Sequence, residues 1–342
     1  MHLQVHSPER LTAHQLDDYL EKGWFRMGQN IFTTHFIRND QKILSTIWLR
    51  IQLENFNPDI PLIKKNRKFR ISYALAELSP EKEELFARYK QNVAFHGSDS
   101  LHQLMIGQHG ERSVFNTYEV MLYDNSRLIA CGYFDLGALS AEGITSFYDP
   151  DYKKFSLGKY LIYLKIMYCK DLGLKYFYPG YFVPGNRHFD YKLSIGNEAL
   201  QYLDLPSASW MPIQSWTEQT IPIEMMRRKL TRVQQLLLDH NRECRLLHYS
   251  FFDANFSVEM RDTGLLDFPL FLSCGSDEEI SPVLVFDVRD SKYHLLSCAP
   301  VWKLQAPIMV ENFYTAYYLM PVAEVHVSES EIEIAGVLSA AE

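Results

Sequence analysis

The sequence has little cysteine, and its cysteines stand far apart from one another. No two of them show the spacing typical of zinc ligands or redox pairs. Their number is odd, which gives no indication of a disulfide framework. The sequence therefore predicts neither a zinc site nor disulfide bonds. The five cysteines are Cys131, Cys169, Cys244, Cys274 and Cys298.

Long apolar runs are also missing. No stretch approaches the roughly 20 apolar residues that a membrane-spanning helix needs. Residues 1–10 lack the apolar core of a signal peptide. There are no internal repeats and no low-complexity segments. We therefore expect a cytoplasmic protein that has no membrane partner.

An excess of positive charge is absent as well. The chain carries 34 Lys and Arg against 42 Asp and Glu, a formal net charge of −8. This balance excludes a uniformly basic, nucleic-acid-binding surface. Local basic clusters stay compatible with such binding, because affinity for phosphates follows the local charge.

The most informative stretch of the chain is 143–192. Residues 144–148 are apolar or β-branched and are followed by a proline, which predicts a strand that ends there. Ser156 stands at the N-cap position of a run of apolar residues at helical spacing. Gly173 follows as a C′ residue, and a second strand is predicted directly after it. A strand, a loop and a helix N-terminus make a site suited to a phosphate or a polarised carbonyl.

The segment before this stretch predicts a hairpin. Residues 119–123 and 128–135 flank a short polar turn. A hairpin, a third strand, a helix and a fourth strand follow one another as in an N-acetyltransferase core. The predicted fold class is therefore α/β (α+β), with a GNAT-like fold that has a mixed sheet and a central helix.

Three domains are predicted along the chain. They are an N-terminal α/β domain (1–92), an N-acetyltransferase-like catalytic domain (93–220) and an extension with a helix and strands (221–342). The extension carries no functional assignment. Further helices are expected at 11–26, from Pro80 and at 223–242, and further strands at 31–36, 44–53, 283–288 and 294–298.

Several segments resemble one protein family. They are LIACGYFD (128–135), TSFYDPD (145–151), SLGKYLIYLKI (156–166), YFYPGYFVPGNRHFDYK (176–192) and SWMPI (209–213). In this order they are similar to the arginyl-tRNA–protein transferase family, which includes the bacterial aspartate/glutamate leucyltransferases. The resemblance implies transfer of arginine or leucine from aminoacyl-tRNA to the N-terminal Asp or Glu of a protein, as in N-degron pathways.

The reaction implied by the resemblance needs no covalent nucleophile. An aminoacyl ester is already activated, so the enzyme supplies positioning, a proton acceptor for the amine and donors for the carbonyl oxygen. The sequence has no G-x-S-x-G motif and no cysteine–histidine signature. Aminoacyl-tRNA is then a co-substrate, and no cofactor or metal is expected.

Candidates for proton transfer and donor binding lie inside the matching segments. We expect 149–158 and 176–192 to line one cleft. Aspartates at a strand end also cap turns, and isolated tyrosines are often core residues, so these interpretations stay open as well. The catalytic candidates are Asp149, Asp151 and Tyr181, and the residues expected to bind the 3′ end of the donor are Ser156, Leu157, Gly158, Tyr178 and Tyr191.

Cationic residues are candidates for binding the acceptor and the tRNA. Arg187, His188 and Lys192 are expected to select the acidic N-terminal residue of the acceptor. Two basic clusters are expected to contact tRNA phosphates, because RNA duplexes are bound largely through shape and backbone. The acceptor-binding candidates and the two basic clusters are also compatible with ordinary solvent-exposed residues that bind nothing. The clusters contain Lys64, Lys65, Arg67 and Lys68 in one and Arg227 and Arg228 in the other.

The sequence departs from the family at three points. The stretch 34–46 lacks the paired cysteines that many members carry, so no iron–sulfur cluster is expected. Lys165 stands where the family usually has an acidic residue, and His188 where it usually has lysine. If the acidic residue contacts a cationic donor side chain, Lys165 disfavours arginine by like-charge repulsion.

Two other functions stay open. One is an acyl-CoA-dependent N-acetyltransferase, although the loop before Leu157 lacks the glycine-rich pattern that binds the CoA pyrophosphate. The other is a catalytically silent relative that binds tRNA or protein N-termini without transfer.

Overall fold

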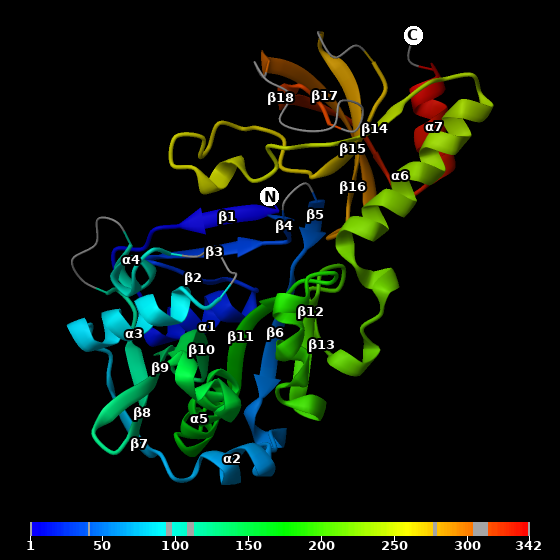
Figure 1. Ribbon diagram of the computed structural model, residues 1–342. Coiled ribbons are helices and arrows are strands. Elements are labelled where there is room, and N and C mark those ends of the chain that lie inside the picture. The colour runs from blue at the N-terminus through cyan, green and yellow to red at the C-terminus, as the bar shows by residue number, and fades with distance from the viewer. Residues whose placement is uncertain are drawn as a thin grey trace.

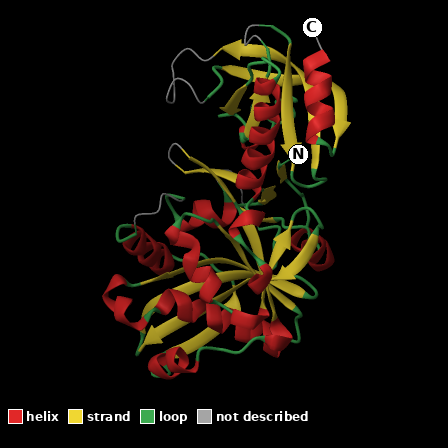
Figure 2. Cartoon of the chain, turned by 90° about the vertical axis from the view of Figure 1, so that its right-hand side faces the viewer, coloured by secondary structure: helices red, strands yellow, loops and turns green. Residues whose placement is uncertain are grey.

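The chain folds into two lobes, each built around its own sheet (Figures 1 and 2). The computed structural model describes residues 2–39, 42–93, 98–107, 113–275, 279–303 and 314–340. Sheets and helices are mixed in both lobes, which confirms the coarse α+β class. Within these residues, every helix is too short or too polar to cross a bilayer.

An eight-stranded sheet forms the larger lobe. Its order is β13-β12-β6-β11-β10-β9-β8-β7, and β10 and β11 are its one parallel pair among the described strands. Because β6 and β7 belong to 1–92, the sheet crosses the predicted boundary at residue 92/93. The strands are β6 (Ile47–Gln52), β7 (Arg70–Leu75), β8 (Thr117–Asp124), β9 (Arg127–Leu136), β10 (Ser140–Tyr148), β11 (Tyr176–Phe182), β12 (Leu200–Asp204) and β13 (Ser209–Pro212).

Helices cover both faces of this sheet. Side chains alternate between faces along a strand, so Phe134 of β9 packs with α5 while Tyr133 packs with α3 and α4. The helix α1 lies on the same side as α3 and packs against Tyr178. The helices of this lobe are α1 (Ala13–Glu21), α2 (Ile60–Asn66), α3 (Pro80–Lys90), α4 (Leu101–Ile106) and α5 (Leu157–Asp171).

The central helix α5 begins and ends where the sequence predicts. Gly173, with φ of +78°, follows its last turn and confirms the predicted C′ residue. The expected N-cap role of the Ser156 side chain is wrong, because this side chain makes no capping hydrogen bond. Ser156 also ends the preceding 3-10 helix and has a left-handed backbone (φ 55°), whereas a capping side chain needs an extended one.

Two strands replace the single strand predicted at 44–53. The strand is interrupted at Thr46, where the chain passes from the small β4-β5 sheet to the large sheet, and the Thr46 amide still donates to the carbonyl of His35 at 2.9 Å. The alternating apolar pattern continues through this interruption, so it does not reveal it. The small sheets have the orders β1-β3-β2 and β4-β5 and contain β1 (Leu3–His6), β2 (Phe25–Met27), β3 (Asn30–Thr34), β4 (Phe36–Asn39) and β5 (Lys42–Ser45).

The smaller lobe is a five-stranded antiparallel sheet with two helices. The helix α6 (Pro222–Asp239) confirms the helix predicted at 223–242, although it starts one residue earlier, with Pro at its first position, and it buries an apolar stripe against the sheet. The C-terminal helix α7 (Glu331–Ala340) was not expected from the sequence. The strands, in sheet order, are β14 (Arg245–His248), β15 (Leu270–Ser273), β16 (Ser281–Asp287), β17 (Lys292–Lys303) and β18 (Tyr317–Ser328).

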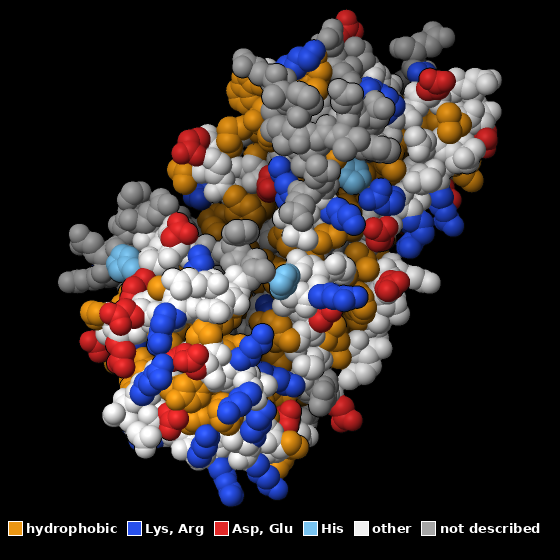
Figure 3. All heavy atoms as spheres, viewed as in Figure 1, with side chains coloured by type: hydrophobic (Ala, Val, Ile, Leu, Met, Phe, Trp, Pro, Cys, Tyr) orange, Lys and Arg blue, Asp and Glu red, His pale blue; other side chains and the backbone are white. Residues whose placement is uncertain are grey.

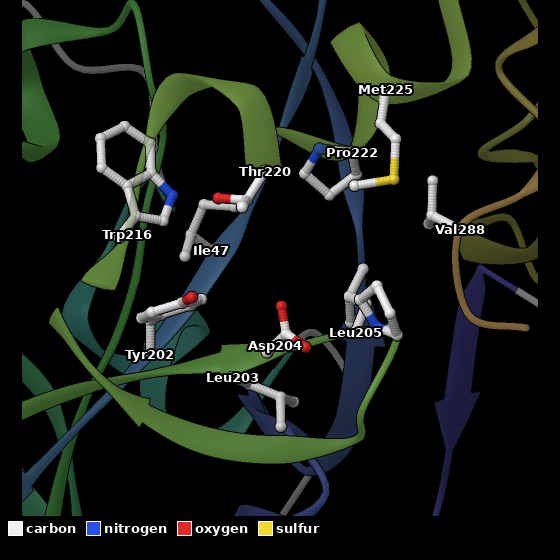
Figure 4. Close-up of a pocket in the computed structure, with 11 residues that line it drawn as sticks. Ile47, Tyr202, Leu203, Asp204, Leu205, Trp216, Thr220, Pro222, Met225 and Val288 are labelled. Carbon is white, nitrogen blue, oxygen red and sulfur yellow. The ribbon is translucent and has the colours of Figure 1, made fainter. Parts of the chain in front are cut away.

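The lobes meet where α6 starts beside the large sheet. Figure 4 shows a small cavity at this junction, with Ile47 and Tyr202 from the sheet and Met225 from α6 around it. Its volume is ≈ 10 Å³, which is close to the space of a single water molecule. The junction is therefore closely packed at this point.

Candidate active site

The parallel strands β10 and β11 diverge and open the large sheet. The two strands pair over three residues only, Ser140–Glu142 of β10 with Tyr176–Tyr178 of β11. Beyond this, β10 follows β9 through a bulge at Gly143, while β11 pairs with β6 through a bulge of its own. The gap between the two strands lies directly beside the N-terminus of α5.

A cavity of ≈ 490 Å³ occupies this gap. Its walls come from both faces of the sheet, since α3 and α4 contribute on one face and α5 on the other. The lining includes Phe86, Tyr89 and Leu104 from α3 and α4, Gly158, Ile162 and Lys165 from α5, Gly143, Ile144, Thr145 and Ser146 from β10, and Phe177 and Pro179 from β11.

The charged groups of this cavity are all cationic. Lys90, Lys159, Lys165 and Lys192 line it, and among its described lining residues there is no Asp or Glu. The remaining walls are mostly apolar or aromatic. A cationic site with apolar walls favours an anionic ligand and repels a cationic one.

Lys192 is held by the backbone of β11. Its Nζ donates to the carbonyl of Tyr181 at 2.8 Å, and a Cβ at Gly180 would lie 3.1 Å from this nitrogen. Glycine at this position therefore lets the ammonium approach the strand. Burial lowers the pKa of Lys192 to about 7, because the charged form is poorly solvated. An incoming carboxylate would stabilise the charged form.

Lys165 lies at the inner end of the cavity and is fully buried. Its Nζ donates to the carbonyls of Tyr133 and Thr145, at 3.3 and 3.0 Å, and to the Ser146 hydroxyl at 3.0 Å. These acceptors match the three donors of an ammonium group. Burial lowers the pKa of Lys165 to about 7. The contacts fix the bulged part of β10 and place a cationic group beside the site.

The N-terminus of α5 faces the cavity through Gly158. Ser156 does not cap the helix, so its side chain leaves the first-turn amides available to a ligand. A Cβ at Gly158 would lie 3.3 Å from Cε1 of Tyr148. Leu157 is fully buried in the core, so it can contribute only its backbone amide.

Tyr178 and Tyr181 do not line the cavity, which corrects the expectation that their side chains face this site. Tyr178 packs with α1 on the other face, and its hydroxyl donates to Glu21 at 3.2 Å. The ring of Tyr181 lies against Trp48 and Phe189, with ring centroids 5.0 and 5.6 Å away. The β11 bulge turns both rings away, and Tyr181 contributes its carbonyl instead.

Asp149 and Asp151 also lie outside the cavity. Asp149 is buried and forms ion pairs with Arg127 and with Arg88, the latter at 3.4 Å. It also accepts from the amide of Asp151 at 3.2 Å, so it caps the 3-10 helix after β10. Asp151 is exposed. This arrangement corresponds to the turn-capping interpretation of the two aspartates.

The segment η3 (Arg187–Ser194) divides the predicted acceptor residues Arg187, His188 and Lys192 and also carries Tyr191, which was predicted to bind the donor. Tyr191 and Lys192 line the cavity, whereas Arg187 and His188 are exposed and lie outside its lining. Three residues complete a turn of a 3-10 helix, so neighbours in η3 point in different directions. Of the predicted site residues, the structure thus brings together Gly158, Tyr191 and Lys192.

The predicted basic cluster around α2 is exposed on the larger lobe. Figure 3 shows many Lys and Arg side chains over α5 and α2 on this face. Lys153, Lys154 and Lys159 extend the cluster toward the cavity. Arg227 and Arg228 lie on α6 in the other lobe, and Arg227 is paired with Glu224 at 3.6 Å.

Sequence reasoning missed several lining residues. Lys90 and Tyr89 come from α3, far from the central stretch in sequence, and no local pattern marks them. Thr145 and Ser146 lie within the predicted strand. They line the cavity because β10 no longer pairs with β11 at these residues, and this divergence cannot be read from the local sequence.

The comparisons with known proteins point to one family. Residues 81–202 match the family described as "Arginine-tRNA-protein transferase, C terminus". The chain is 33% identical over 202 residues to an aspartate/glutamate leucyltransferase of Leptospira interrogans, covering 54% of this chain and 78% of that protein. It is 27% identical over 183 residues to the protein of the same name from Campylobacter jejuni, covering 52% and 75%.

Solved structures resemble parts of the chain more distantly. The ribosomal-protein-S18-alanine N-acetyltransferase from Escherichia coli has a TM-score of 0.24 at 20% identity, covering 31% of this chain and 63% of that one. FemX has a TM-score of 0.33 at 8% identity, covering 55% and 65%. The chain thus spans less than two thirds of either structure. On the sequence matches, the chain belongs to the arginyl-tRNA–protein transferase family.

Proposed function

We propose that this protein transfers an amino acid from aminoacyl-tRNA to the α-amine of a polypeptide that begins with Asp or Glu. The relatives named aspartate/glutamate leucyltransferase support this proposal. The observation that carries it is the cationic cavity between β10 and β11, which is lined by elements on both faces of the sheet. The cytoplasm, where charged tRNA is found, is the proposed location.

We also propose that β8 to β11 and α5 form an N-acetyltransferase-type core. The element order and the diverging parallel pair support this finer assignment. In this proposal residues 93–220 provide most of the catalytic domain, 1–92 adds β6 and β7 to its sheet, and 221–342 is a separate extension.

In the proposed reaction the acceptor amine attacks the carbonyl carbon of the aminoacyl ester. A C–N bond forms, and the C–O bond to the ribose of the tRNA breaks. As the C–N bond forms, the attacking –NH2 nitrogen loses one proton, and the ribose oxygen takes up a proton and leaves as a hydroxyl, so the protons balance. The α-ammonium group loses its proton before the attack, which is accessible near neutral pH because its pKa is about 8.

The chain's own groups position this reaction. The amides at the start of α5, at Leu157 and Gly158, donate to the carbonyl oxygen as negative charge develops there. Lys192 binds the side-chain carboxylate of the acceptor's first residue. The aromatic and apolar walls exclude water, which would otherwise hydrolyse the ester. No cofactor is needed in this scheme.

Among the two donors that the sequence left open, we propose leucine. The guanidinium group of arginine would enter a cavity with four lysines and no carboxylate among its described lining residues. The uncharged side chain of leucine would find the apolar groups of Ile144, Ile162 and Phe177. Like-charge repulsion and the cost of an unpaired buried charge both favour leucine.

One assay separates the proposed function from the two alternatives. The pure protein is incubated with charged tRNA pools and, separately, with labelled acetyl-CoA, in the presence of peptides that begin with Asp, Glu or Ala. We expect label from aminoacyl-tRNA on the Asp and Glu peptides. Label from acetyl-CoA alone would indicate an N-acetyltransferase, and binding of tRNA without transfer would indicate a silent relative.

A further inference from the structure

A second large cavity lies between the two lobes. Its volume is ≈ 580 Å³. Both lobes contribute to it, through β5 and the end of β11 on one side and α6 and β14 on the other. Its wall residues Arg227 and His248 lie outside the stretch that matches the family, 81–202.

The 3-10 helix η3 separates this cavity from the catalytic one. Asp190 and Leu193, three residues apart, line the cavity between the lobes. Tyr191 and Lys192 line the catalytic cavity. Because a 3-10 helix has three residues per turn, Asp190 and Leu193 lie on one side of η3. A chain that crosses η3 passes from one cavity into the other.

The two cavities differ in charge. The catalytic cavity has lysines only, whereas the second one is lined by Asp190, Glu218 and Glu224 along with two cations. Of these cations, Arg227 is already paired with Glu224 at 3.6 Å. A tRNA backbone would meet like charge here, whereas a polypeptide with basic or neutral residues would not.

Arg227 and His248 form one polar wall of this cavity. The Nε2 atom of His248 lies 3.4 Å from an Arg227 nitrogen that can only donate, so Nε2 is the acceptor and Nδ1 carries the hydrogen. Nδ1 is buried, so a bound polypeptide would contact the ring of His248 and the guanidinium group of Arg227.

We propose that the cavity between the lobes binds the acceptor polypeptide downstream of its N-terminal residue. The chain runs in extended form over η3 and carries its first residue to Lys192. An extended residue spans about 3.3 Å and a helix is about 10 Å across, so roughly three residues cross η3. The smaller lobe is then an acceptor-binding element. This inference rests on the proposed function.

The test compares acceptors of different length. Transfer is measured to an Asp-led tripeptide and to Asp-led peptides of about twelve residues, with Lys or Glu placed from about position four onward. We expect the long basic peptide to have a several-fold lower KM than the tripeptide. The long acidic peptide is expected to lose this advantage.

Charge reversal at the second cavity provides the matched variants. Glu218→Lys and Asp190→Lys are expected to raise the KM of the long basic peptide about two- to fivefold each, as for exposed charge pairs, while leaving the tripeptide unchanged. Glu243→Lys, an exposed substitution outside both cavities, is the control and is expected to change neither.

The outcomes separate the docking proposal from the proposed function. Transfer with no dependence on length or downstream charge would overturn the docking site and leave the transferase activity standing. No transfer to any acceptor would overturn the proposed function itself. A photoreactive residue at about position five of the long peptide gives a second readout. It is expected to label α6 or η3, and labelling of the lysine-rich face over α2 and α5 would overturn the proposal.

Discussion

The ammonium group of Lys192 donates to the backbone carbonyl of Tyr181, 2.8 Å away, rather than to a carboxylate. The lysine thereby lies at the edge of a cavity whose described lining residues include no acidic group. A partly buried cation of this kind can bind an incoming carboxylate without first breaking an internal ion pair. This relationship underlies the account of acceptor selection.

Replacing Lys192 by Ala is expected to remove the preference for acidic N-termini. Loss of one partner of a buried charge pair costs about 2–5 kcal/mol, or about 30- to 4,000-fold in selectivity. The measurement is the ratio of kcat/KM for Asp- and Asn-led peptides. Arg187→Ala is the control, because Arg187 is exposed, and should change this ratio by less than about threefold. Full selectivity in Lys192→Ala would place acceptor recognition elsewhere.

The same ratio is expected to depend on pH. Burial lowers the pKa of Lys192 to about 7, so the lysine is charged below this pH and neutral above it. Selectivity for Asp over Asn should therefore be highest below pH 7 and fall as the pH rises through it. Both peptides carry an α-amine that titrates near pH 8, so most of its pH dependence cancels in the ratio. A ratio that stays constant from pH 6 to pH 9 would contradict this role.

Asp149→Asn is expected to affect stability more than catalysis. The Asp149 carboxylate is buried against Arg88 and Arg127, which are about half exposed. Losing these charge-assisted hydrogen bonds should lower the free energy of unfolding by about 1–3 kcal/mol. Denaturant unfolding and kcat are measured on the same preparation, and kcat should stay within about threefold. A folded variant whose kcat falls a hundredfold would instead make Asp149 catalytic.

Local patterns in the sequence predicted α5 well. The patterns that predict the start of α5, its end at Gly173 and its two flanking strands all involve residues that are close together in the chain. Gly158 and Lys192 were also identified, although through family resemblance. The orientation of Tyr178 was mispredicted because it depends on the pairing of β11 with two distant strands. Lys90 reaches the cavity from α3 only after the sheet has formed, and no local pattern reveals this.

Binding of tRNA is expected to weaken steeply with salt. Each phosphate that is neutralised contributes about −0.9 to the slope of log K against log salt for a duplex. Lys64→Ala combined with Lys65→Ala should therefore make the slope less steep by about 1–2. Filter binding of charged tRNA at several salt concentrations measures it. An unchanged slope would show that the exposed lysines of α2 do not contact the tRNA.

The central claim is that an amino acid passes from tRNA to an acidic N-terminus within the cationic cavity. Its most direct test is a single-turnover reaction with leucyl-tRNA or arginyl-tRNA and an Asp-led peptide, followed by mass spectrometry of the peptide. We predict leucine on the peptide's α-amine and at least about tenfold slower transfer of arginine, corresponding to about 1.4 kcal/mol of charge repulsion. Faster transfer of arginine would contradict the assignment of the donor to this cavity, and absence of both products would contradict the central claim.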